Sequence, residues 1–182
     1  MKTIRLITLS LLLPLSTLTF NSSLAGNTEL TTKEEFVEKL TPKPVVKTRS
    51  IRLNGQQAAN EAAPAPKVSM QINFEHDSYE LTAQSKEKLQ PLGEALVSDE
   101  LLKYHFNIAG HTDATGSDAY NQTLSGKRAV AVGQFLYDNF GIDPARLKLS
   151  GHGEKELLDT ENPNSEVNRR VEITTLVQSA SE

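Results

Sequence analysis

The 182-residue chain contains no cysteine. A chain without thiols has no disulfide scaffold, no thiol nucleophile, no thiolate-bound zinc or iron–sulfur centre and no lipid anchor on an N-terminal cysteine. Strong charge of either sign is also missing, because 19 basic and 23 acidic residues leave a net charge of −4. Sequence-independent nucleic-acid binding depends on dense positive charge, so we expect no nucleic-acid partner.

Long apolar runs are absent apart from one at the N-terminus, at residues 6–20. Lys2 and Arg5 precede this run, and Ser23-Leu24-Ala25 follows it with small residues at the spacing that signal peptidases recognise. The run is shorter than the ~20 apolar residues of a spanning helix. We therefore expect residues 1–25 to be a signal peptide cleaved after Ala25, and the mature chain to have no transmembrane segment.

Residues 26–67 are polar, rich in proline towards their end, and predicted to form an arm or linker. One short helix is expected inside it, because Thr32 and Glu35 form a capping-box pattern. The apolar stripe of this helix consists of Phe36, Val37 and Leu40. Such a short helix is marginal alone in water, so it must dock on something or fray.

The arm and the rest of the chain differ in charge. Residues 26–67 carry seven bases and five acids, whereas residues 68–182 carry ten bases and eighteen acids. A solvated linker is the simplest interpretation of the arm. The alternatives are that its basic stretch lies on the acidic domain, contacts an anionic polymer or lipid head groups, or contacts an outer-membrane or other envelope protein.

The pattern of a compact domain begins at residue 68 and extends to 177, which leaves 178–182 as a tail. Alternating apolar residues predict strands near 68–74, 104–108, 147–149 and 171–173, and helical spacing predicts helices over 82–97 and 118–140. Pro91 lies inside the first of these helices, so we expect a kink or break near Gln90. The order β-α-β-α-β-β predicts an α+β fold, with helices on one face of a mixed sheet.

Candidate binding chemistry lies between the second strand and the long helix. Asp113 is in the loop that follows the strand, and Arg128 is on the helix. If both face one cleft, Asp113 can accept from an ammonium group and Arg128 can clamp a carboxylate, with the amide of Asn121 nearby. An ordinary Asp–Arg salt bridge that locks the loop explains the same pair equally well.

A resemblance favours the binding interpretation. OmpA-like peptidoglycan-binding domains have a signature of TD, two residues, G, then YN, LS and RA, and this chain resembles it at HTDATGSDAYNQTLSGKRAVAV. Further segments that resemble the family in order and spacing are INFEHDSYELT, LKLSGHGE and NRRVEITTL. The resemblance covers about residues 68–177. It implies a sandwich of helices packed on one face of a mixed four-stranded sheet.

The resemblance also implies a ligand and its contacts. Asp113 and Arg128 match the residues that grip diaminopimelate in the peptidoglycan stem peptide, a group that presents both an amine and a carboxylate. The other residues implied at the site are Thr112, Asn121, Ser125, Asp77 and one of Arg169 and Arg170. Between the last two, Arg169 is the more exposed candidate. Leu124 is expected in the core.

Binding without catalysis is therefore expected: non-covalent anchoring to the cell wall in a Gram-negative periplasm, with no cofactor and no metal. His111 and His152 lack a convincingly spaced third metal ligand. One alternative is a wall-anchoring subunit of a flagellar motor or secretion complex, with residues 26–67 as the partner-binding arm. A wall hydrolase fits less well, because no nucleophile stands out.

Overall fold

The computed structural model describes residues 30–43, 64–75 and 78–177. The predicted signal peptide and most of the arm lie outside these ranges. The elements are α1 (Lys33–Leu40), β1 (Lys67–Met70), α2 (Ala83–Leu96), β2 (His105–His111), α3 (Asp118–Phe140), η1 (Pro144–Arg146), β3 (Leu147–Gly153), η2 (Glu166–Asn168) and β4 (Val171–Leu176). Within the described ranges, no helix has the length and apolarity that a bilayer crossing requires.

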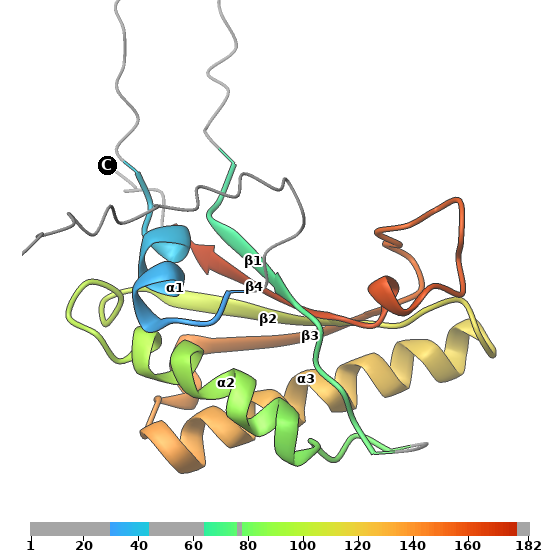
Figure 1. Ribbon diagram of the computed structural model, residues 1–182, viewed down its shortest axis with the longest axis horizontal. Coiled ribbons are helices and arrows are strands. Elements are labelled where there is room, and N and C mark those ends of the chain that lie inside the picture. The colour runs from blue at the N-terminus through green and yellow to red at the C-terminus, as the bar shows by residue number, and fades with distance from the viewer. Residues whose placement is uncertain (1–29, 44–63, 76–77, 178–182) are drawn as a thin grey trace, which may run out of the picture.

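The four strands form one mixed sheet in the order β1-β4-β2-β3. β4 is antiparallel to both β1 and β2, whereas β2 and β3 are parallel. Helices α2 and α3 lie together on one side of the sheet, and the loop between β3 and β4 rises at the end where α3 begins (Figure 1). The predicted α+β class, with helices on one face of a mixed four-stranded sheet, is confirmed.

Period-two alternation explains which side chains face the helices. In β4, Val171 and Ile173 are buried, and so are the apolar residues that pair with them, Met70 and Val68 in β1 and Ile108 in β2. The first strand is shorter than predicted, since β1 ends at Met70. Ile72 is nevertheless buried, and Phe74 forms only an isolated bridge with Leu81.

Helix α2 continues through Pro91 from Ala83 to Leu96, so the break expected near Gln90 is not found. Thr82 caps its start by accepting a hydrogen bond from the Ser85 amide. The cost of the proline, ~3 kcal/mol, is offset because this helix buries its apolar face against α3 and the sheet. Gly93 is required there, since a Cβ at this position would collide with the ring of Phe140 on α3.

Helix α3 spans the predicted residues. The Ser117 hydroxyl accepts from the Tyr120 amide at its start, and Gly141 ends it in a left-handed conformation with φ of 65°. This helix packs directly on the backbone of β2 and β3. A Cβ on Gly110 would collide with the main chain of Ser125, and one on Gly151 with the main chain of Gly126.

Helix α1 is part of the packed unit. Phe36 and Leu40 are fully buried in the same apolar cluster as the sheet and α2, and the capping box of Thr32 and Glu35 is complete. The Thr175 hydroxyl of β4 donates to the Leu40 carbonyl over 2.6 Å. The helix expected within an arm therefore docks on the domain, so residue 68 does not mark the edge of the packed unit.

Replacing Phe36 with alanine tests this docking. Loss of a fully buried phenylalanine removes apolar contact and leaves a cavity, which should lower the free energy of unfolding by about 3 kcal/mol. Glu38→Ala, on the exposed side of the same helix, should change it by less than about 0.5 kcal/mol. Urea unfolding of the mature chain measures both. Equal stability of the two variants would contradict docking of α1 in solution.

Candidate functional site

A cavity of about 500 Å³ opens where β2 ends and α3 begins. Its walls come from the β2–α3 loop, the first three turns of α3 and the residue that follows η2. The lining residues are Thr112, Asp113, Thr115, Tyr120, Asn121, Leu124, Arg128 and Arg169.

The β2–α3 loop is held by main-chain hydrogen bonds to its neighbours. The Thr112 amide donates to the Gly153 carbonyl of β3, and the Ala114 amide donates to the Pro163 carbonyl of the long loop. Gly116 supplies the positive φ, 105°, that the turn requires. The Asn121 amide nitrogen lies 3.1 Å from the Thr115 carbonyl and 2.6 Å from a carboxylate oxygen of Glu154. The Asn121 side chain lines the cavity, and its hydrogen bonds hold the β2–α3 loop in this conformation.

Asp113 presents a largely buried carboxylate at the cavity wall. One oxygen accepts from the Thr115 amide at 3.0 Å, and the other pairs with Arg169 at 2.8 Å. Burial by itself raises the pKa of Asp113, but the hydrogen bonds from Arg169 and Thr115 outweigh it and hold the pKa below its ordinary value. The carboxylate is therefore ionised at neutral pH.

Arg169 reaches the cavity because the long loop before β4 is folded around a buried asparagine. The Asn168 side chain accepts from the amides of Leu158 and Asp159, and its nitrogen lies 3.0 Å from the Pro163 carbonyl. Arg169 follows directly, pairing with Asp113 through one nitrogen and with Glu166 through another. The hydrogen bond to Asp113 raises the pKa of Arg169.

Arg128 enters the cavity from α3 without a carboxylate partner among the described residues. Its guanidinium carbon lies 4.7 Å from the centroid of the Phe74 ring, and one nitrogen lies 3.5 Å from the Ser78 carbonyl. Burial lowers the pKa of Arg128, yet a guanidinium keeps its charge at any relevant pH. The salt bridge considered between Asp113 and Arg128 is not formed, because Asp113 pairs with Arg169 instead.

Two buried polar atoms of the cavity residues have no hydrogen-bond partner within the described part of the chain. They are Nε of Arg128 and the hydroxyl oxygen of Thr112. Leaving a buried polar group unpaired costs ~1–3 kcal/mol, so such atoms point to a ligand that supplies the partner. With an ionised carboxylate on one wall and, on another, a guanidinium whose Nε has no partner within the described residues, the cavity suits a small zwitterion.

The structure gathers five of the eight expected residues at this cavity: Thr112, Asp113, Asn121, Arg128 and Arg169. Two others lie elsewhere. Arg170 is buried and bonded to Glu172. Ser125 has no exposed surface, because it sits at the seam between α3 and β3, where its hydroxyl accepts from the Gly153 amide. Asp77 lies outside the described residues.

The position of Leu124 also differs from the expected one. It was expected in the core but is only partly buried, and it lines the cavity. Tyr120 and Thr115 also line the cavity, and Phe74 supports Arg128, none of which sequence reasoning had placed there. The one available signal for Tyr120 was its position eight residues before Arg128, which puts both on one side of a helix.

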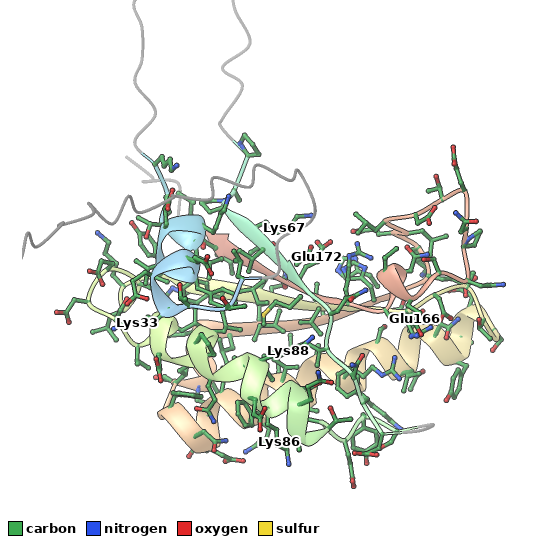
Figure 2. All side chains as sticks on the ribbon, viewed as in Figure 1. Lys33, Lys67, Lys86, Lys88, Glu166 and Glu172 are labelled. Carbon is green, nitrogen blue, oxygen red and sulfur yellow. The ribbon has the colours of Figure 1, made fainter. Side chains whose placement is uncertain are left out.

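A buried ionic cluster supports the strand ends beneath the loop. Glu172 pairs with Arg170 at 2.7 Å and with Lys67 at 2.8 Å, and His111 lies 3.9 Å away. Lys67 and Glu172 lie together on the side of the sheet away from α2 (Figure 2). Burial opposes ionisation of Glu172, but Lys67 and Arg170 lower its pKa to about 2. Burial lowers the pKa of His111 to about 4.

No described part of the chain brings three or more histidine, aspartate or glutamate side chains together in an arrangement that could hold a metal ion. His152 stacks on His111, with ring centroids 5.1 Å apart, and pairs with Glu156 at 2.8 Å. The carboxylate of Glu172 near His111 is already shared between Lys67 and Arg170. The ring nitrogens of His111 have no hydrogen-bond partner within the described residues.

Comparison with known proteins assigns the family. The model of the OmpA family matches residues 73–170, more than half of the chain, so the chain belongs to the OmpA family. Outer membrane porin F of Pseudomonas aeruginosa is 30% identical over 126 residues, which cover 68% of this chain and 34% of the porin. Outer membrane protein A of Shigella flexneri is 36% identical over 115 residues, 58% of this chain and 32% of that protein. The chain thus spans about a third of the length of these relatives.

Solved structures share the fold. A MotB-like protein from Desulfovibrio vulgaris superposes with a TM-score of 0.50 and 28% identity, covering 60% of this chain and 71% of that one. The periplasmic domain of MotB from Helicobacter pylori gives a TM-score of 0.52 at 20% identity, covering 62% of this chain and 76% of that one.

The pKa values of His111 and Glu172 predict how the free energy of unfolding depends on pH. A histidine in the unfolded chain has a pKa of about 6.5, whereas the pKa of His111 in the folded domain is about 4. As the pH falls, the unfolded state therefore binds a proton first, and the free energy of unfolding decreases between pH 6.5 and pH 4. Glu172 adds a further loss between about 4.5 and 2. Urea unfolding at pH 7.5 and pH 5 should differ by up to about 2 kcal/mol through His111.

His111→Gln removes the titrating group, so most of that difference between pH 7.5 and pH 5 should disappear. His105→Gln, at the other end of β2, is the matched control and should retain it. An undiminished pH dependence in His111→Gln would show that another group causes it.

Proposed function

We propose that this domain binds peptidoglycan non-covalently by holding the diaminopimelate of a stem peptide in the cavity beside Asp113. The observation that carries the proposal is the charge arrangement there: an ionised Asp113 on one wall, and a half-buried Arg128 whose Nε has no partner within the described residues. Diaminopimelate offers the complementary pair, since its distal end has an ammonium and a carboxylate on one carbon. Membership of the OmpA family supports the assignment.

In this arrangement Arg128 binds the carboxylate. Its Nε and the adjacent Nη form one edge of the guanidinium group. This edge can donate two parallel hydrogen bonds to a carboxylate. Packing on Phe74 holds the fork in place before the ligand arrives, and this reduces the entropy lost on binding. The Thr112 hydroxyl, which also has no partner within the described residues, can donate to the same carboxylate.

Asp113 receives the ammonium group. It keeps its contact with Arg169, because a carboxylate has about four lone-pair positions, and the hydrogen bonds from Arg169 and Thr115 leave part of this capacity open. Arg169 and the Thr115 amide therefore orient Asp113 and keep it charged, while its remaining acceptor positions face the ligand. The proposal is binding without turnover, since every role assigned here is recognition of charge and shape.

The cellular setting follows from the same proposal. The predicted signal peptide would deliver the chain to the periplasm of a Gram-negative cell, where the domain would tether it to the wall. A single contact of this kind has an affinity of ~−4 to −8 kcal/mol, and repetition of the ligand along the wall adds avidity. Association with the outer membrane through a protein partner of residues 26–67 remains part of the proposal.

A subunit of a larger envelope machine is the second candidate function. It depends on residues 26–67 as a partner-binding arm. Within the described residues, α1 turns Phe36 and Leu40 into the domain rather than towards a partner. A partner of the arm would therefore contact residues 44–63 or the outer side of α1, and a pull-down with the whole mature chain, with and without 44–63, would identify it.

Sedimentation with purified sacculi tests the diaminopimelate site. Asp113→Asn and Arg128→Ala should each weaken binding at least about 30-fold, because each leaves one charge of the bound zwitterion unpaired at a cost of about 2 kcal/mol or more. Arg128→Lys should retain part of the binding, since it keeps the charge without the bidentate fork. Asp99→Asn, exposed after α2, is the control.

Circular dichroism and the unfolding midpoint establish that each variant is folded. If folded Asp113→Asn and Arg128→Ala pellet with sacculi as the wild type does, the cavity is not the wall-binding site. Release of soluble fragments from sacculi by the mature protein would overturn the proposal of binding without turnover.

A further inference from the structure

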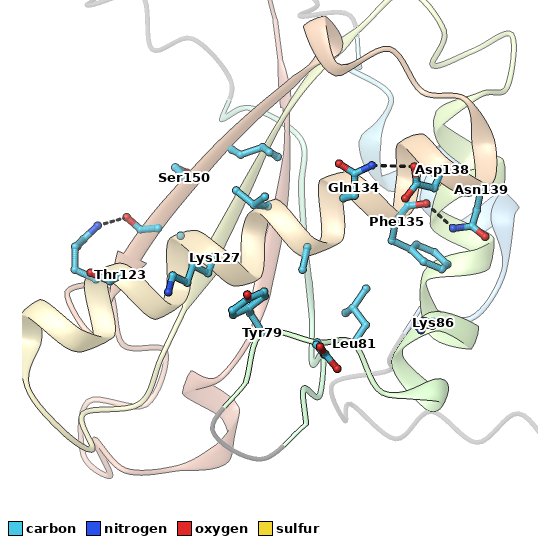
Figure 3. A pocket seen from close by; sticks show the side chains of 17 residues that line it. Tyr79, Leu81, Lys86, Thr123, Lys127, Gln134, Phe135, Asp138, Asn139 and Ser150 are labelled. Carbon is cyan, nitrogen blue, oxygen red and sulfur yellow. Dashed lines mark hydrogen bonds between the residues drawn. The ribbon is translucent and has the colours of Figure 1, made fainter.

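A larger groove of about 1020 Å³ runs along the outer side of α3. The segment that contains Tyr79 and Leu81 forms one side of it, and the edge strand β3 forms the other through Leu149, Ser150 and Gly151. Figure 3 shows Tyr79 and Lys127 beside each other, between Thr123 on one side and Asp138 and Asn139 on the other.

The groove adjoins the diaminopimelate cavity at two elements that contribute residues to both. On α3, Lys127 lines the groove and the next residue, Arg128, lines the cavity. On the segment before α2, the Ser78 carbonyl accepts from Arg128, and the next residue, Tyr79, lines the groove. A ligand that is held by Arg128 and extends along α3 can therefore reach Tyr79 and Lys127.

Lys127 is a cation without an anionic partner in the described part of the chain. Its ammonium nitrogen lies 5.5 Å from the centroid of the Tyr79 ring and makes a cation–π contact with it. The ring itself is 49% exposed. The other charged groups of the groove are Glu80, Lys86 and Asp138, and the last of these accepts from Gln134 at 2.8 Å.

We propose that the groove binds the part of the stem peptide on the sugar side of diaminopimelate, with Lys127 pairing with the α-carboxylate of its glutamate. This inference rests on the proposed function. In the stem peptide, glutamate is joined to diaminopimelate through its side-chain carboxyl, which leaves its α-carboxylate as the next anionic group along the chain. The Tyr79 ring supplies the apolar wall against which the peptide methylenes pack.

Binding of three soluble ligands measured by calorimetry tests the proposal. They are meso-diaminopimelate, the tripeptide L-alanyl-γ-D-glutamyl-diaminopimelate, and the same tripeptide with isoglutamine in place of glutamate, which removes only the α-carboxylate charge. Wild type should bind the glutamate tripeptide about three- to fivefold more tightly than the isoglutamine tripeptide, the range of a partly exposed ion pair.

Lys127→Ala should abolish this preference while its affinity for free diaminopimelate stays unchanged. Lys103→Ala is the matched control, because Lys103 makes the same kind of contact with Tyr104, at 5.2 Å, outside the groove. Tyr79→Ala should weaken both tripeptides equally, and Tyr137→Ala, equally exposed at 49% but not part of the groove lining, should weaken neither.

The outcomes separate the two proposals. Binding of none of the three ligands by folded wild type would overturn the diaminopimelate site itself. Binding of both tripeptides with equal affinity, or an unchanged preference in Lys127→Ala, would overturn the groove proposal and leave the diaminopimelate site standing. A preference that disappears in Lys127→Ala but persists in Lys103→Ala supports it.

Discussion

The close contact between α3 and the backbones of β2 and β3 is the constraint on which the site depends. Gly110 and Gly151 leave no side chain between helix and sheet, so the main chain of Ser125 and Gly126 rests on the strands. The Ser125 hydroxyl completes the seam through the Gly153 amide. Because the helix cannot shift along this seam, the loop before it and the residue one turn after Leu124 have defined positions. Asp113 and Arg128 face one cavity for that reason.

Charge at the cavity is organised so that each ionised group is stabilised without being neutralised by the other. Arg169 keeps Asp113 ionised, and the Phe74 ring supports the guanidinium of Arg128. A direct pair between Asp113 and Arg128 would have occupied both of the groups that we propose to bind the ligand. The rest of the domain is acidic, so attraction of a charged polymer by the overall field is weak, and recognition depends on this local arrangement.

Two buried asparagines make the loops around the cavity rigid. Asn121 holds the β2–α3 loop, and Asn168 holds the loop before β4, each through hydrogen bonds to main-chain groups. A side-chain amide both donates and accepts, so it can replace the ladder partners that irregular backbone lacks. Arg169 is placed by this second loop, which explains why a residue 56 positions away in the chain contacts Asp113.

Much of the fold followed from local patterns, because helix caps and alternating burial depend on neighbouring residues. The capping box of Thr32 and the helix over 118–140 were identified from the sequence, and the class of the sheet was predicted correctly. The family signature placed Asp113, Asn121 and Arg128 at one site. A break at Pro91 was expected because the cost of the proline is local, whereas the burial that offsets it is not.

Only the tertiary structure decided the pairing of charges and the roles of Leu124 and Ser125. Leu124 and Ser125 are adjacent on α3, and adjacent helical residues point about 100° apart. Which of the two lines the cavity and which is buried therefore depended on how α3 is rotated on the sheet. Steric contact at Gly110 and Gly151 sets that rotation, and no local pattern encodes it. The sequence by itself determined which chemical groups are present and where the helices and strands form. Long-range packing determined that Arg169 pairs with Asp113 and that Arg128 has no carboxylate partner within the described residues.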